Sequence, residues 1–225
     1  MNRQNSDYEN KVKAKVEKCL KIKIVRQAIK YAEDVVSGVE VAPWEVQKQC
    51  EIILEDWNVN QYKEDWEYTF SYKHIKRIAK IIKLMKFATG FVAGQSIYDH
   101  LAPYQAFLIV NLFGWRYKTR LYKFKHNDIT LYVSRKNAKT ATVGIIFILL
   151  MLTEQNFSEF YSICLNKDLA AEIRKSMVQI LQASPLLEQQ FTISLSKLGK
   201  LECKITKSFF EPRVAKQIGH LIRNY

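Results

Sequence analysis

The sequence is poor in residues that interrupt or crosslink a chain. Only 7 glycines and 4 prolines occur among 225 residues, and 48% of the residues are hydrophobic, so a disordered or collagen-like chain is excluded. The four cysteines, Cys19, Cys50, Cys164 and Cys203, form no Cys-x-x-Cys pair and no zinc-like cluster with histidine. We therefore predict buried free thiols, which are typical of a reducing compartment.

Long hydrophobic runs and an apolar beginning are also missing. The first residues, Met-Asn-Arg-Gln-Asn-Ser-Asp, have no apolar core, so we expect no signal peptide. The longest apolar run, from Val143 to Leu152, is about half of the ~20 residues that a membrane span needs. This run is predicted to be a buried core helix.

Positive charge is abundant and unevenly distributed. The chain carries a net charge of +13, of which residues 1–100 contribute +3 and residues 101–225 contribute +10. Such an excess favours polyanionic partners: nucleic acid, a nucleotide or an acidic membrane surface. A generally basic solvated surface is the alternative, because charge alone does not separate the two.

Helical periodicity dominates the first part of the chain. Apolar residues recur at helical spacing from Lys11 to Ser37, and Gly38 is a suitable left-handed stop. A second helix is predicted to begin near Pro43, and Ser71 is predicted to cap a third. We therefore predict a helical N-terminal region over residues 1–95. Its lysines either contact DNA or form ordinary solvated helix faces.

Strands and helices alternate in residues 96–225. A helix is predicted over Pro103–Phe113, where proline occupies a favoured first-turn position. Buried strands are predicted at Ile129–Val133 and Phe160–Leu165, and an amphipathic helix at Lys167–Ala183. This order of strands and helices indicates parallel strands in an α/β fold.

The segment Ser134-Arg-Lys-Asn-Ala-Lys-Thr140 joins the first predicted strand to the apolar helix. A strand, a short basic loop and a helix form a phosphate-binding P-loop, in which the helix N-terminus points its N–H groups at phosphate. In that arrangement Lys139 reaches the β- and γ-phosphates, and the Thr140 hydroxyl ligates Mg²⁺. The match to G-x-x-x-x-G-K-[ST] is incomplete, because Val133 and Ala138 stand at its two glycines.

A hairpin signal follows over residues 192–206, where Lys197-Leu-Gly-Lys200 separates two short strand-like runs. The predicted fold class is therefore α/β: a helical N-terminal region, then an incomplete P-loop NTPase-like sheet with flanking helices. The second part, residues 96–225, is predicted to be a partial P-loop ATPase domain.

Several segments together resemble the large subunit of tailed-phage terminase, the motor that packages viral DNA into capsids. The similar segments, in chain order, are Ala28–Gly38, Tyr104-Gln105, Leu112–Arg116, Ser134–Thr140, Asn166–Ala171 and Phe210–Pro212. The loop is similar to the family's deviant phosphate loop, which commonly reads Arg-Lys-Asn-Gly-Lys-Ser. The resemblance covers residues 26–214 and implies a phage protein of the host cytoplasm that is not secreted.

The resemblance also implies roles for individual residues. Gln105, beside Tyr104, is similar to the family's adenine contact, since an amide both donates to and accepts from adenine. A polar residue that packs on the core is the alternative. Arg135, the catalytic candidate, and Lys136 would stabilise charge on the transferred phosphoryl group, unless they belong to a general basic patch. Asn137 would hold the loop by bonding to its own backbone.

The cofactors implied by the resemblance are ATP and Mg²⁺. The predicted ATP-binding residues are Gln105, Ser134, Arg135, Lys136, Asn137, Ala138, Lys139 and Thr140. The implied partners are double-stranded viral DNA, the terminase small subunit, the portal protein and other copies of the large subunit, and no membrane.

Two features of the family have no counterpart after residue 140. One is the strand ending in Asp-Glu that holds Mg²⁺, and the other is the cluster of aspartates of the C-terminal nuclease. The acids that do follow the loop are Glu154, Glu159, Asp168, Glu172, Glu188, Glu202 and Glu211, and none closes an apolar run. We therefore expect a truncated or frameshifted copy, or one piece of a split gene, without nuclease activity.

Two other interpretations stay open. The chain is alternatively a non-catalytic basic DNA-binding or assembly module derived from a terminase. A third interpretation is an unrelated basic protein in which Ala-Lys-Thr occurs by chance. Nucleotide binding that requires Lys139 separates the ATPase interpretation from the other two.

Overall fold

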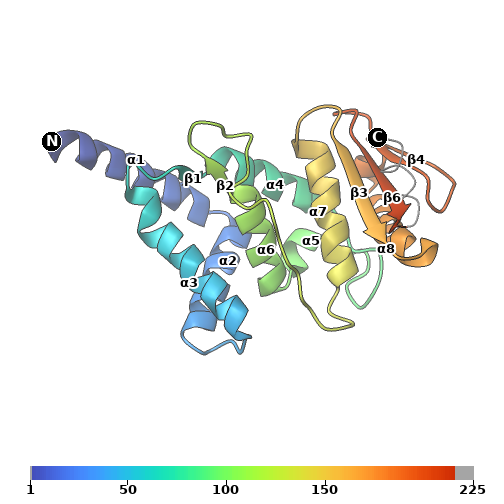
Figure 1. The fold of residues 1–225 in the computed structure, drawn as a ribbon, viewed down its shortest axis with the longest axis horizontal. Helices are drawn as coiled ribbons and strands as arrows, with labels where there is room; N and C mark the ends of the chain where they lie inside the picture. Colours follow the sequence, from blue (N-terminus) through green and yellow to red (C-terminus); the bar gives the residue numbers. More distant parts are fainter. Residues whose placement is uncertain (1, 216–225) are drawn as a thin grey trace. The chain divides into compact units, whose positions relative to one another are not determined.

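The computed structural model describes residues 2–215, and the side chains of residues 6–215, in two compact units (Figure 1). The first unit contains residues 2–80 and Leu101–Ile129. The second contains Ile81–His100 and residues 130–215. Each unit has its own core.

The first unit is mainly helical, and the helices at the N-terminus agree with the predicted fold class. Its elements are α1 (Asn2–Leu20), α2 (Lys23–Val36), α3 (Trp44–Asn58), the 3-10 helix η1 (Asn60–Tyr62), β1 (Tyr68–Phe70), the greater part of α4 (Tyr72–Leu84), α6 (Pro103–Gly114) and β2 (Trp115–Tyr117). Helix α2 packs against α3 and α6, and β1 pairs with β2 in an antiparallel ribbon. The helix starts predicted at Pro43 and Pro103 are confirmed within one residue.

The single helix predicted from Lys11 to Ser37 is wrong, because the chain breaks between α1 and α2. Lys21 and Ile22 are outside both helices, and Ile22 has an extended backbone with φ −86° and ψ 119°. The apolar spacing continues through the break, so periodicity does not reveal it. The left-handed stop at Gly38 is confirmed by its φ of +79°.

Aromatic rings fill the core of the first unit. Trp57, Trp66 and Phe70 each pack edge-on against Trp115, with ring centroids between 5.1 and 6.3 Å apart. Gly114 precedes Trp115 and lies against the Phe70 ring, where an added Cβ would meet Phe70 Cε2 at 2.2 Å. A glycine is therefore required at the end of α6 by the ring that packs on it.

The second unit combines helices with a four-stranded sheet. Its remaining elements are α5 (Ile97–His100), α7 (Lys139–Thr153), β3 (Glu159–Cys164), α8 (Lys167–Gln182), α9 (Pro185–Glu188), β4 (Phe191–Ile193), β5 (Leu201–Cys203) and β6 (Phe209–Val214). The strand order is β3-β6-β5-β4, with β3 parallel to β6 and the other pairs antiparallel. Helix α8 contacts both α7 and the sheet. The α/β fold class is thus confirmed.

Most predicted elements of this unit are present. The apolar run is buried in α7, the strand and helix after it are β3 and α8, and the hairpin is β4-β5. One detail differs from the prediction of buried thiols: Cys164 is half-buried rather than buried. None of the described helices combines the length and the hydropathy that spanning a bilayer requires.

The strand predicted at Ile129–Val133 does not form. Residues 126–134 adopt neither helix nor strand, and Tyr132 is 96% exposed. Alternating apolar residues make a strand only when a neighbouring strand pairs with their backbone N–H and C=O groups. Among the described residues no strand pairs with this segment, whereas β3 has β6 beside it.

Gly114→Ala is expected to lower the free energy of unfolding by about 1–3 kcal/mol, the usual cost of overpacking a core. The added methyl group overlaps the Phe70 ring, which packs edge-on against Trp115 and must shift. Urea denaturation of both proteins measures the loss. In a Phe70→Leu background, which lacks the clashing ring atoms, Gly114→Ala should cost clearly less. An equal cost in both backgrounds would show that the ring is not responsible.

Candidate nucleotide-binding site

The loop Ser134–Thr140 turns sharply and leads directly into α7. Lys136 and Ala138 both have left-handed backbone, with φ values of 69° and 50°, and the helix begins at Lys139. Successive N–H groups in a turn, or in paired right- and left-handed conformation, point to one side and create an anion-binding concavity. The loop is therefore a tight turn with two left-handed residues directly before a helix.

Hydrogen bonds within the loop and the first turn of α7 fix this shape. The Asn137 side-chain amide donates to the Ser134 hydroxyl at 2.6 Å, so Asn137 braces the loop. The Thr142 backbone N–H and hydroxyl both donate to the Ala138 carbonyl, at 2.9 and 3.0 Å. Ala138 is thereby held as the residue from which the helix starts.

The electrostatics of the loop favour an anion. Arg135, Lys136 and Lys139 contribute three positive charges, the loop contains no acid, and all of its residues are exposed. The first N–H groups of a helix lack intrahelical partners and carry the positive end of its dipole. In α7, a helix of 15 residues, those groups begin at Lys139 and Thr140, where the sequence analysis placed the phosphate and Mg²⁺ contacts.

Gln105 lies in the first unit, in the first turn of α6. It is buried, and its Oε1 accepts a hydrogen bond from the Ala102 backbone N–H at 2.9 Å. This contact satisfies one N–H at the beginning of α6, a role that resembles capping. It corresponds to the alternative of a polar residue packed on the core, and the adenine contact stays a prediction.

Three of the acidic residues that follow the loop are paired with other side chains. Glu159 accepts from the Tyr161 hydroxyl at 2.5 Å, Asp168 pairs with Lys197 at 2.5 Å, and Glu211 pairs with Arg213 at 3.0 Å. Among the described residues, no three His, Cys, Asp or Glu side chains gather where they could hold a metal ion. Thr140 is therefore the metal-ligand candidate supported by its place in the loop.

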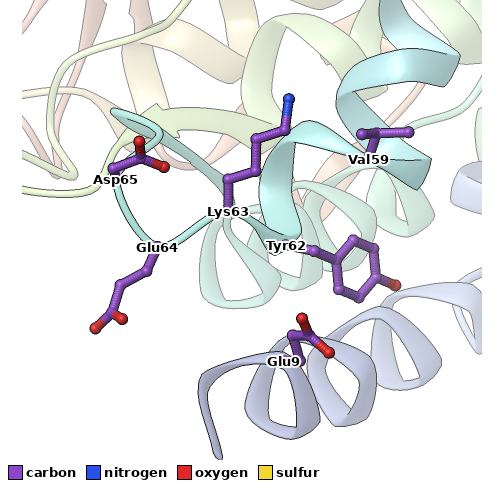
Figure 2. Close-up of a pocket in the computed structure, with 6 residues that line it drawn as sticks. All are labelled: Glu9, Val59, Tyr62, Lys63, Glu64 and Asp65. Atoms are coloured by element: carbon purple, nitrogen blue, oxygen red, sulfur yellow. The ribbon is translucent and has the colours of Figure 1, made fainter. Parts of the chain in front are cut away.

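A cavity of about 440 Å³ is present in the first unit, whereas the loop is part of the second unit. Figure 2 shows its lining residues, Glu9, Val59, Tyr62, Lys63, Glu64 and Asp65. The Lys63 ammonium donates to the Asn60 side-chain oxygen at 2.8 Å. Three carboxylates against one ammonium make this cavity unsuitable for a phosphate.

Comparison with protein families shows the class to which this mixed α/β chain belongs. The model of the terminase large subunit ATPase domain matches residues 103–216, just over half of the chain. The chain therefore belongs to the terminase large subunit ATPase domain family. This membership confirms the family resemblance and rules out an unrelated protein with a chance Ala-Lys-Thr.

The large terminase of bacteriophage HK97 is similar in structure, with 19% sequence identity and a TM-score of 0.48. The similarity covers 63% of this chain and 27% of the HK97 chain, so this chain spans about a quarter of that protein's length. No protein of curated function matches the sequence.

Ala138→Gly is expected to tighten ATP binding or leave it unchanged. A non-glycine residue in left-handed conformation is strained by roughly 1–2 kcal/mol, and glycine removes that strain without changing the φ of 50°. Titration calorimetry measures the affinity. The matched control is Ala141→Gly in the first turn of α7, where glycine costs about 0.5–1 kcal/mol of stability and gives the loop nothing. A clear loss of affinity in Ala138→Gly alone would contradict the proposed loop geometry.

Proposed function

We propose that this chain binds Mg²⁺ and ATP at the Ser134–Thr140 loop, as the ATPase portion of a phage DNA-packaging motor. The observation that carries the proposal is the basic loop with left-handed Lys136 and Ala138 at the N-terminus of α7. Its position inside the segment that matches the terminase ATPase domain supports the same function.

Individual loop residues take different parts in this function. Lys139 contacts the β- and γ-phosphates, and the Thr140 hydroxyl ligates Mg²⁺. Arg135 stabilises the negative charge that develops on the transferred phosphoryl oxygens. Ser134 and Asn137, which are hydrogen-bonded to each other, keep the loop in its binding shape.

Lys139→Ala is expected to weaken ATP binding at least tenfold, because a charge-assisted hydrogen bond contributes about 1.5–3 kcal/mol. Titration calorimetry of both proteins measures the difference. Lys175→Ala, which removes an exposed lysine of α8, is the control for the general effect of charge and should bind ATP as the unchanged chain does. Equal affinities in all three proteins would exclude this loop as the site.

The 225-residue chain is expected to hydrolyse ATP very slowly or not at all with Mg²⁺. Phosphoryl transfer depends on positioning and electrostatics, and the loss of one element typically costs on the order of 10²–10³ in rate. Among the described residues, no group of three His, Cys, Asp or Glu side chains is placed to hold a metal ion. For the same reason it should not cut DNA, which needs clustered acids for two metals. Steady turnover that Lys139→Ala abolishes would contradict this and implicate an acid such as Glu202 or Glu211.

The wider role follows from the family and the charge. We propose that the motor to which this portion belongs acts in the host cytoplasm on double-stranded viral DNA. Its protein partners are the small subunit, the portal protein and other large subunits. The net charge of +10 over residues 101–225 supports contact with DNA.

A non-catalytic DNA-binding or assembly module is the second candidate. The basic charge and the absence of a metal-holding cluster among residues 6–215 favour it. Salt-sensitive DNA binding that is the same in Lys139→Ala, without any ATP binding, would support this candidate over the first.

A further inference from the structure

Thr142 is a polar residue in the buried stripe of α7. It is fully buried, as are Ile145 and Leu149, which follow it at helical spacing. Figure 1 shows α7 lying along β3, where Phe147 packs against Phe160 with ring centroids 6.3 Å apart. A hydroxyl in such surroundings costs free energy unless it is hydrogen-bonded. The hydrogen bond that Thr142 makes is therefore the reason that a polar residue can occupy this position.

The acceptor of that hydrogen bond belongs to the Ser134–Thr140 loop. The Thr142 hydroxyl donates to the Ala138 carbonyl oxygen at 3.0 Å, and the Thr142 backbone N–H donates to the same oxygen at 2.9 Å. A carbonyl oxygen has two lone pairs, so both are used by this one residue. A single buried residue of α7 therefore holds the last loop residue before the helix with two hydrogen bonds.

The direction of the Ala138 carbonyl also sets the direction of the next N–H group. A trans peptide unit is planar, so its C=O and its N–H point in opposite directions. Because the Ala138 C=O points along α7 toward Thr142, the Lys139 N–H points away from the helix, beyond its first turn. Rotation of this peptide unit would put a carbonyl oxygen where the N–H was, and that oxygen would repel a phosphate.

Ala138 needs a restraint of this kind because its backbone is strained. Its φ of 50° and ψ of 23° lie in the left-handed region, which is unfavourable for a residue with a Cβ atom. A strained residue keeps its conformation only where the surrounding contacts hold it. On the loop side, Asn137 is hydrogen-bonded to Ser134. On the helix side, the restraint comes from Thr142.

We infer that Thr142 is a positioning residue for the phosphate site. Its buried hydroxyl fixes the Ala138 carbonyl, and through that peptide unit it directs the Lys139 N–H toward the phosphates. The inference rests on the proposed binding of ATP at this loop. Thr142 acts through Ala138 and does not itself touch ATP, because it is fully buried in the core-facing stripe of α7.

Thr153 makes the same type of hydrogen bond at the other end of α7. Its hydroxyl donates to the Leu149 carbonyl, four residues back, at 2.7 Å. The two threonines are separated by about 16 Å along the helix, at 1.5 Å per residue. Thr153 is therefore a matched control: removing its hydroxyl deletes an equivalent bond of α7 that has no connection with the loop.

Titration calorimetry of the full chain with Mg²⁺ and ATP tests the inference. Thr142→Val and Thr142→Ala both remove the hydroxyl and keep the backbone N–H, and valine has nearly the shape of threonine. Each should bind ATP about three- to tenfold more weakly than the unchanged chain, which is the effect of one hydrogen bond. Thr142→Ser, which retains a hydroxyl, and Thr153→Val should both stay within about twofold of the unchanged chain.

Urea denaturation of the same proteins separates positioning from a general loss of stability. Each variant should be folded at the temperature of the calorimetry, so that a lower affinity reports on the site. Three results would each overturn the inference while leaving ATP binding at the loop intact: equal affinities with and without the Thr142 hydroxyl, equal losses in Thr142→Val and Thr153→Val, or a Thr142→Ser variant as weak as Thr142→Val. An unchanged chain that binds no ATP would instead refute the proposed function, and this inference with it.

Discussion

The left-handed backbone at Ala138, directly before α7, is the constraint on which the candidate site depends. Its φ of 50° and ψ of 23° reverse the chain, and α7 begins at the next residue. Helix α7 keeps that beginning in place, because Ile145, Ile148 and Leu149 are fully buried. Gly144 lets α8 approach closely, and an added Cβ would lie 3.2 Å from the Ser176 hydroxyl oxygen. The first turn of α7, into which the loop leads, is therefore held by a helix that is packed in the core.

Much of this arrangement could be predicted from the sequence, because the signals are local. The apolar run of α7, the Pro103 start of α6 and the Lys197–Lys200 turn each specify structure within a few residues. The loop sequence likewise places Lys139 and Thr140 at a helix N-terminus. The family resemblance, drawn from short segments in order, is confirmed by the match over residues 103–216.

Other features depend on contacts with distant segments of the chain, which a local sequence pattern does not reveal. The Ile129–Val133 pattern has the alternation of a strand, but a strand needs a neighbour, and none of the described strands pairs with it. The break at Lys21 and Ile22 lies inside unbroken helical spacing. The left-handed conformation of Ala138 could not be predicted from the sequence either, because alanine is not a residue typical of turns. The exposure of Trp44 requires knowing which face of α3 the core uses.

The backbone amide NMR spectrum of the ¹⁵N-labelled chain, recorded during titration with Mg²⁺ and ATP, tests the central claim most directly. Because the phosphates would be held by backbone N–H groups, the largest and saturable shifts should fall on residues 135–141. Shifts that concentrate instead around the cavity of Figure 2, at Tyr62 to Asp65, would contradict the account. An unchanged spectrum at millimolar ATP would contradict it equally.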